Sequence, residues 1–311
     1  MASAAASAVD LSVQVGSVTL ANPVMTASGT AGHGDELGAY VDLSSIGAVV
    51  VKSLSADPWD GNPAPRVHET PAGMINSVGL QGPGVEYWLR NELPAVLRTG
   101  ATVVASIWGS TVEDYARAAE MLAGAPPEVV AVEVNVSCPN HHDRNRMFAH
   151  SPVTTAEVIE VAAVCGRPMW AKLSPNVADL ASIARAAVDA GAEAVTLINT
   201  VLGMVIDVER REPLLGGRGG GLSGPAIHPV AVRAVHDVRA AHPDITIVGV
   251  GGVANGVDAI ELLMAGASAV QIGTASFADP RTVERVRDEI ERWCASHGVR
   301  AVRDLIGAVH D

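Results

Sequence analysis

The feature that most constrains the fold of this chain is a series of eight short β-rich runs separated by longer amphipathic stretches. Runs such as VVAVEVNVS and ITIVGVGG are apolar almost throughout. Continuous apolar character predicts strands that are buried on both faces, as in a parallel sheet covered by helices. We expect the eight strands at residues 22–28, 48–54, 102–108, 129–137, 169–174, 194–200, 245–252 and 269–275.

The segments between these strands carry apolar residues at helical spacing, most clearly at 112–125, 154–166, 177–192 and 253–267. Eight βα units in one chain predict a single (β/α)8 barrel, the TIM barrel of α/β proteins, preceded by a β-hairpin over 11–20. A doubly wound sheet is the alternative, but no G-x-G-x-x-G turn follows the first strand. Left-handed helix ends are expected at Gly124, Gly166 and Gly191.

Composition excludes several classes of protein. Lys and Arg total 21 against 34 Asp and Glu, a formal net charge of −13, which argues against nucleic-acid and anionic-membrane surfaces. The three cysteines show no C-x-x-C spacing, so we expect no disulfide framework, metal site or iron–sulfur cluster within this chain. We expect residues 1–10 to be a disordered leader rather than a signal peptide, and residues 11–311 to form one barrel domain. We expect the protein to be soluble and cytoplasmic.

Two connections are too long to be simple turns and contain many Pro and Gly residues: 55–82 and 201–225. Both follow the C-terminal ends of expected strands, which is the face where barrel enzymes place their sites. Loops of this length in a compact domain are usually functional. We therefore expect both loops to build the site.

Only two of the 21 basic residues are lysines, Lys52 and Lys172, and each lies near the C-terminal end of an expected strand. A compact ammonium suits a crowded anionic ligand. A lysine that only snorkels at the barrel rim, or one that forms a Schiff base, remains an alternative.

The last two strands end in Gly251-Gly252 and Gly273-Thr274. Small residues allow backbone N–H groups to approach a phosphate, which barrels commonly bind at these two loops. Tight turn geometry alone is the other explanation.

Asparagine is depleted in strands, yet Asn135 and Asn199 stand at strand exits. An amide both donates and accepts hydrogen bonds, which suits an imide or amide edge such as that of a pyrimidine ring, although either residue could instead cap a loop. Cys138 follows Asn135 closely and can face a ligand, whereas Cys165 and Cys294 fall in helical patterns and are expected to be buried. The adjacent His141 and His142 lack a carboxylate cluster and predict no metal site.

Several motifs, in order and with compatible spacing over about residues 12–280, jointly resemble the dihydroorotate dehydrogenase family. They are Lys52-Ser53, Gly61-Asn62-Pro63-x-Pro65-Arg66, Asn76 to Gln81, Asn135-x-Ser137-Cys138-Pro139-Asn140, Lys172 to Asn176, Ile198-Asn199-Thr200 and Gly220 to Ile227.

This resemblance implies an FMN-containing barrel that oxidises dihydroorotate to orotate in pyrimidine synthesis. Cys138 would be the general base that removes the C5 proton while hydride leaves C6 for flavin N5, and cysteine rather than serine points to the soluble class 1 enzymes. The resemblance assigns substrate binding to Lys52, Asn76, Ser77, Val78, Gly79, Leu80, Asn135, Asn199 and Thr200. It assigns FMN binding to Ser28, Lys52, Ser53, Ser106, Asn135, Lys172, Ile198, Gly224, Gly251, Gly252, Gly273 and Thr274.

The chain departs from the family pattern at three places. Ser106 stands where the family usually has a flavin-contacting asparagine, and Gly82 replaces a common asparagine. Residues His141 to Arg146 replace a glycine-containing stretch after the base, which puts loop closure and substrate preference in question.

The motif details are more similar to the NAD-linked branch of class 1 than to the branch that reduces fumarate. That branch implies a partner subunit carrying FAD and an iron–sulfur cluster, around a homodimer of this chain. Three other functions stay open: oxidation of another dihydropyrimidine such as dihydrouracil, a non-flavin aldolase or isomerase with Lys172 as Schiff base, and a non-catalytic assembly subunit.

Overall fold

The computed structural model describes residues 9–137 and 147–310. Eight parallel strands form one sheet in the order β3-β16-β15-β10-β9-β8-β7-β4. A parallel bridge between Met25 and Ala48 joins the two outer strands, so the sheet closes into the predicted barrel. Each expected strand contains an observed one: β3 (Val24–Thr26), β4 (Val49–Val50), β7 (Val103–Ile107), β8 (Val129–Asn135), β9 (Met169–Lys172), β10 (Ala194–Leu197), β15 (Ile247–Val250) and β16 (Ala269–Ile272).

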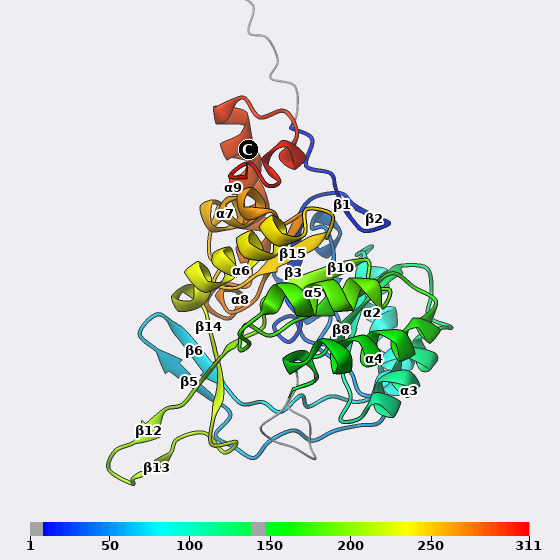
Figure 1. Cartoon of the computed structure of the whole chain (residues 1–311), viewed down its shortest axis with the longest axis vertical. Helices are drawn as coiled ribbons and strands as arrows, with labels where there is room; N and C mark the ends of the chain where they lie inside the picture. Colours follow the sequence, from blue (N-terminus) through cyan, green and yellow to red (C-terminus); the bar gives the residue numbers. More distant parts are fainter. Residues whose placement is uncertain (1–8, 138–146, 311) are drawn as a thin grey trace, which may run out of the picture.

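Helices surround this barrel (Figure 1). Two of them begin with a capping box, formed by Thr111 with Asp114 and by Asn255 with Asp258, which satisfies backbone N–H groups that a helix start leaves unpaired. The four predicted helical segments are confirmed. The helices are α1 (Val85–Tyr87), α2 (Leu93–Arg98), α3 (Val112–Leu122), α4 (Pro152–Ala162), α5 (Leu180–Asp189), α6 (His228–Ala241), α7 (Gly256–Ala265), α8 (Ala275–Ala278) and α9 (Thr282–His297).

The first βα unit differs from the prediction. Between β3 and β4 the chain forms two short 3₁₀ helices, Glu36–Ala39 and Leu43–Ser45, in place of an α-helix. The preceding segment, residues 29–38, contains four glycines, which disfavour a longer helix.

The helix-end prediction is confirmed for Gly166 (φ 62°) and Gly191 (φ 109°) and is wrong for Gly124. Helix α3 instead tightens at its end, where the N–H groups of Ala123 and Ala125 bond to carbonyls three residues back. Such 3₁₀-type bonds satisfy the last carbonyls without a left-handed residue.

The N-terminal hairpin is also confirmed, with β1 (Val13–Val15) antiparallel to β2 (Val18–Leu20). Ahead of it, Asp10 already pairs with Ala301 near the C-terminus of the chain. No helix among residues 9–137 and 147–310 is long and apolar enough to cross a bilayer.

The two long loops meet in a second sheet, with strands in the order β11-β14-β6-β5. Asn76 of the first loop lies opposite Gly221 of the second. The strands are β5 (Val67–Thr70), β6 (Gly73–Asn76), β11 (Val201–Gly203) and β14 (Gly220–Ser223).

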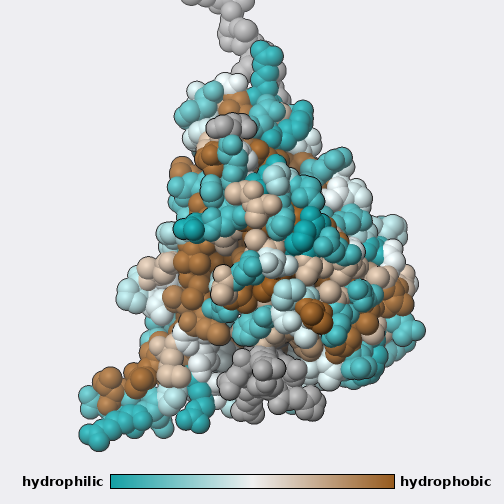
Figure 2. Space-filling view, viewed as in Figure 1, coloured by the Kyte–Doolittle hydropathy of each residue, from teal (hydrophilic) through white to brown (hydrophobic). Residues whose placement is uncertain are grey.

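Beyond this sheet a hairpin of β12 (Ile206–Asp207) and β13 (Glu212–Pro213) projects from the barrel at the lower left of Figure 1. Apolar side chains lie exposed along this arm, and Figure 2 shows them as a brown patch. They are Leu202, Met204, Ile206 and Val208.

Candidate active site

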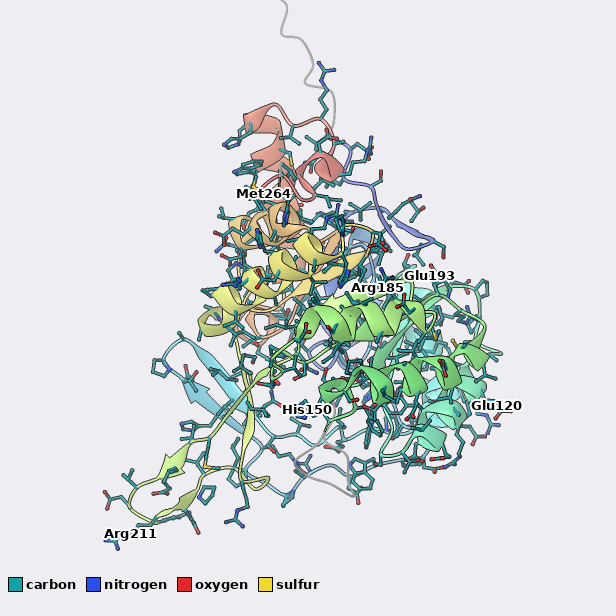
Figure 3. All side chains as sticks on the ribbon, viewed as in Figure 1. Glu120, His150, Arg185, Glu193, Arg211 and Met264 are labelled. Atoms are coloured by element: carbon teal, nitrogen blue, oxygen red, sulfur yellow. The ribbon has the colours of Figure 1, made fainter. Side chains whose placement is uncertain are left out.

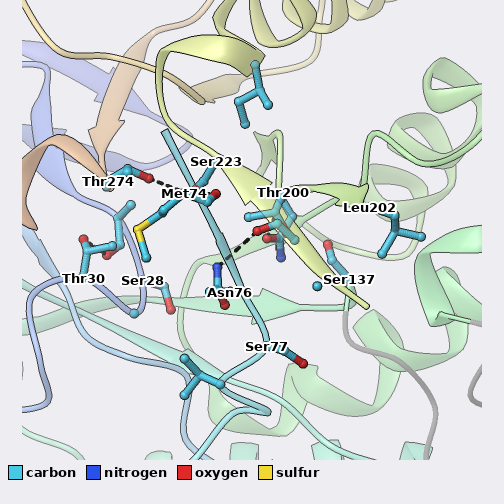
Figure 4. Close-up of a pocket in the computed structure, with 18 of the residues that line it drawn as sticks. Ser28, Thr30, Met74, Asn76, Ser77, Ser137, Thr200, Leu202, Ser223 and Thr274 are labelled. Atoms are coloured by element: carbon cyan, nitrogen blue, oxygen red, sulfur yellow. Dashed lines mark hydrogen bonds between the residues drawn. The ribbon is translucent and has the colours of Figure 1, made fainter. Parts of the chain in front are cut away.

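A cavity of about 990 Å³ opens at the C-terminal ends of the barrel strands (Figure 4). Its walls come from the strand ends and from both long loops, as the loop lengths predict. Ligand cavities usually measure roughly 300–1,000 Å³, so this one has room for a cofactor and a substrate together.

The cavity brings together the residues that the sequence assigns to it. All nine expected substrate-binding residues line it, and eleven of the twelve expected FMN-binding residues do. Cys138 and the stretch His141 to Arg146 lie outside the described residues. The lining set is Ser28, Lys52, Ser53, Asn76, Ser77, Val78, Gly79, Leu80, Asn135, Lys172, Ile198, Asn199, Thr200, Gly224, Gly251, Gly252, Gly273 and Thr274.

Ser106 is the exception, because the structure places it behind the cavity wall. Its side chain is fully buried, and its hydroxyl lies 2.9 Å from that of Ser53 and 3.3 Å from that of Ser28. Serine is too short to reach past these two hydroxyls, whereas the family's asparagine would be longer. Ser106 therefore does not line the cavity itself but lies against Ser28 and Ser53, which do.

Lys172 ends strand β9, and its side chain is almost fully buried. Its Nζ atom lies 3.5 Å from Oε1 of Glu133, which is fully buried on β8. The other oxygen of Glu133 accepts hydrogen bonds from Gln271 at 2.7 Å and Thr196 at 3.1 Å. A buried carboxylate needs such partners, because desolvation strongly disfavours an unpaired charge. These contacts fix an ammonium on the cavity wall.

The sequence analysis missed Glu133 and Gln271 as parts of the site. A usable signal was present, because each is a polar residue within an otherwise apolar strand. Charged residues are almost never fully buried unless they are paired.

Lys52 follows β4, and its backbone N–H bonds to Gly32 at 3.0 Å. Close by, burial and the positive charge of Lys52 lower the pKa of His33 from 6.5 to about 4. The neutral ring of His33 lies beside Gly82, where an added Cβ would stand 3.3 Å from Nε2. Gly82 thus gives space to His33 where the family commonly has asparagine.

The expected amide groups lie side by side at the exits of β8 and β10. Asn199 Nδ2 donates to Asn135 Oδ1 at 3.4 Å, and Asn135 Nδ2 donates to the hydroxyl of Ser53 at 3.2 Å. Across the cavity, Asn76 Nδ2 is 3.4 Å from the carbonyl oxygen of Gly221 (Figure 4). These side-chain amides can form hydrogen bonds with both donors and acceptors on the edge of a planar polar ring.

Asn176 supports this wall, although the sequence analysis gave it no role. Its amide donates to Ser174 and to the carbonyl of Thr200, and its oxygen accepts from the N–H of Leu202. It therefore ties the end of β9 to the start of the second long loop.

Glycines shape the opposite end of the cavity. Gly224, Gly251 and Gly252 have φ values of 94°, 137° and 73°, which residues with a side chain rarely adopt. A Cβ on Gly252 would lie 2.6 Å from Cβ of His228, and the Nδ1 atom of His228 is 2.9 Å from the carbonyl oxygen of Gly251. These glycines line the cavity, and their backbone next to the end of β15 forms a cradle suited to a phosphate group.

Arg66 holds the first long loop, residues 55–82. Its guanidinium donates hydrogen bonds to the carbonyls of Asn62 and Asp60 and to the side-chain oxygen of Gln81. Within this loop Leu80 has a φ of 62°, and the indole of Trp59 donates to the carbonyl of Gly79 at 2.9 Å. These bonds keep the loop in an otherwise costly conformation.

Together the fold and cavity define a class of protein: a TIM-barrel enzyme whose mouth combines a phosphate-type cradle, two lysines and a group of amides. The family model for dihydroorotate dehydrogenase matches residues 10–293. The chain is 48% identical over 303 residues to the dihydroorotate dehydrogenase B (NAD(+)) catalytic subunit of Desulforudis audaxviator (strain MP104C), covering 97% of this chain and 98% of that one. It is 46% identical over 301 residues to the protein of the same name from Geobacter sp. (strain M21), with 96% and 98% coverage. The chain belongs to the dihydroorotate dehydrogenase family, which confirms the resemblance carried by the motifs.

Proposed function

We propose that this chain oxidises dihydroorotate to orotate for pyrimidine synthesis, with FMN as cofactor and Cys138 as general base. The observation that carries the proposal is the single cavity in which Lys52, Lys172, the amides of Asn76, Asn135 and Asn199, and the glycine cradle meet. This donor set matches a phosphate-bearing cofactor and an anionic, planar substrate with amide edges.

In this proposal backbone N–H groups near one end of the cavity would hold the FMN phosphate, at Gly224, Gly251, Gly252, Gly273 and Thr274. The hydroxyl of Thr274 is held by Ser223 at 2.7 Å, which orients this end of the cradle. Ser28, Lys52, Ser53, Asn135, Lys172 and Ile198 line the flavin, with Ser106 behind them. FMN supplies a hydride acceptor, and Lys172 supplies positive charge beside it.

Lys52 binds the substrate carboxylate and so offsets the repulsion of an anion by a chain of charge −13. Asn76, Asn135, Asn199 and Thr200 bind the amide groups of the ring, and the backbone from Ser77 to Leu80 closes over it. The fixed amides hold the ring in one orientation, which lowers the entropic cost of reaction.

Cys138 follows β8 by three residues, after Asn135. As a thiolate it takes the proton from C5, since the thiolate and not the thiol is the competent base. Bound FMN would accept the hydride from C6, so that the substrate would lose a proton to Cys138 and a hydride to the cofactor.

We further propose that the chain works as the catalytic subunit of an NAD-linked complex, arranged around a dimer of this chain. The named relatives are catalytic subunits, which supports the presence of a partner. This chain's cysteines lack the spacing for a cluster, so FAD and iron–sulfur chemistry is assigned to that partner. The exposed apolar arm is a surface of the kind that mediates protein contacts.

The test is a substrate panel on the purified FMN-loaded chain. Dihydroorotate should reduce the flavin and dihydrouracil, which lacks the carboxylate, should not. Lys52→Met should reduce that preference, because it removes the cation that binds the dihydroorotate carboxylate. Equal reduction by both compounds would instead support the sister activity on other dihydropyrimidines.

A further inference from the structure

The second long loop contains a run in which one side chain stands among five glycines: Gly216-Gly217-Arg218-Gly219-Gly220-Gly221. The expected FMN and substrate contacts leave Arg218 unused. The structure nevertheless places Arg218 on the wall of the cavity, where its side chain is exposed to solvent at the mouth.

Close packing explains the glycines around it. A Cβ on Gly217 would lie 2.1 Å from the hydroxyl of Ser77, and one on Gly221 would lie 2.0 Å from that of Thr200. Similarly, a Cβ on Gly220 would lie 2.5 Å from the carbonyl oxygen of Asn76. The run therefore lies directly against residues assigned to substrate binding, and Arg218 stands at the substrate end of the cavity.

The backbone of Arg218 is fixed. Its N–H bonds to the carbonyl of Leu215 at 2.8 Å in a tight turn, and its φ is 69°. Within residues 9–137 and 147–310, no carboxylate forms an ion pair with its guanidinium, whereas Arg210 on the same arm pairs with Asp207. The backbone of Arg218 is thus held in place, while its guanidinium remains available to bind an anionic ligand.

We propose that Arg218 recruits the anionic substrate at the cavity mouth and passes its carboxylate inward to Lys52. This inference rests on the proposed function. Because the whole chain carries a charge of −13, an approaching anion meets a repulsive field that a local cation at the mouth must offset. A guanidinium matches a carboxylate with two parallel hydrogen bonds, and its exposure at the mouth permits release.

The test compares Arg218→Gln with wild type in steady-state oxidation of dihydroorotate with an artificial electron acceptor. Glutamine is shorter than arginine but stays polar and faces the same left-handed backbone strain, so the main change is the loss of the charge. We expect kcat/KM to fall about tenfold, within the range of electrostatic steering, with kcat nearly unchanged. The salt dependence of kcat/KM should flatten, because screening acts on the lost interaction.

Arg211→Gln is the matched control. Arg211 also has a positive φ, of 57°, but lies at the tip of the arm away from the cavity wall (Figure 3). This variant should behave as wild type, and Arg218→Lys should recover most of the lost kcat/KM. FMN affinity should be equal in all four proteins, while the dissociation constant for orotate rises only in Arg218→Gln.

Three results would overturn the inference: an unchanged kcat/KM and salt dependence in Arg218→Gln, a loss confined to kcat, or a loss of FMN affinity. If wild-type flavin is not reduced by dihydroorotate, the proposed function fails together with this inference. If wild type reacts and Arg218→Gln matches it, only the recruiting role fails.

Discussion

The Nζ atom of Lys172 lies 3.5 Å from Oε1 of Glu133, and both side chains are buried where the barrel interior meets the cavity. Gln271 and Thr196 hold the other carboxylate oxygen, so the lysine occupies the remaining side of a fixed anion. The same buried ion pair therefore stabilises the barrel and holds the positive charge of Lys172 at the cavity wall.

Replacing Glu133 with Gln should therefore destabilise the protein, because it leaves the ammonium of Lys172 buried without its counter-charge. Breaking a buried pair costs ~3–5 kcal/mol of unfolding free energy. Urea unfolding of the FMN-free protein measures this, so that a lost flavin contact of Lys172 does not enter the comparison. The double variant Glu133→Gln/Lys172→Met should recover most of the loss, since no unpaired charge remains. A double variant less stable than Glu133→Gln would contradict this explanation.

Gly273→Ala tests the phosphate cradle. The added Cβ would make ordinary contacts with Ala27 at 3.4 Å and Thr30 at 3.5 Å, both on the cavity wall. The fold should accept it, but the methyl group would crowd the cofactor, and we expect FMN affinity to fall about tenfold, or ~1.4 kcal/mol. Fluorescence titration with FMN measures the change. Gly124→Ala, where a Cβ meets nothing within 4 Å, is the control. Equal FMN affinity in both variants would count against a phosphate at Gly273.

Cys138→Ala should slow flavin reduction by about 10²–10⁴-fold, the usual contribution of a general base. FMN content and orotate binding should persist, because the flavin and amide contacts are assigned to other residues. In wild type the reduction rate should rise with pH as the thiol, with an ordinary pKa of about 8.5, ionises. Stopped-flow absorbance measures both effects. A flat profile between about pH 6 and 9 would remove the thiolate from the mechanism.

His33 predicts a pH dependence of stability. Burial and the charge of Lys52 lower its pKa from 6.5 to about 4, so between these values the unfolded chain binds a proton that the folded chain does not. The unfolding free energy should therefore decrease as the pH falls from 6.5 towards 4. His33→Asn should reduce this slope in urea unfolding, whereas the same change at the exposed His297 should leave it unaltered. An identical slope in both variants would contradict the assignment.

The barrel was predictable because its strands are buried on both faces and so carry an uninterrupted apolar signal. The second sheet was not, because its strands are short, half-buried and rich in glycine. Asn76 and Gly221 pair across 145 positions of sequence, and no local pattern encodes such a contact.

Cavity residues were predictable where an unusual residue type stands at the C-terminal end of an expected strand, as for Lys52, Asn199 and Gly251. Glu133 escaped because its role depends on neighbours from three other strands. The resemblance assigned Ser106 to FMN binding, which stays a prediction; the structure places its hydroxyl against those of Ser28 and Ser53.

The visible spectrum of the purified chain, recorded before and after anaerobic addition of dihydroorotate, tests the central claim most directly. We predict an oxidised flavin spectrum, whose visible absorbance is lost when dihydroorotate is added and returns with an electron acceptor. A colourless protein that cannot be loaded with FMN, or a bound flavin that dihydroorotate leaves unchanged, would contradict the account.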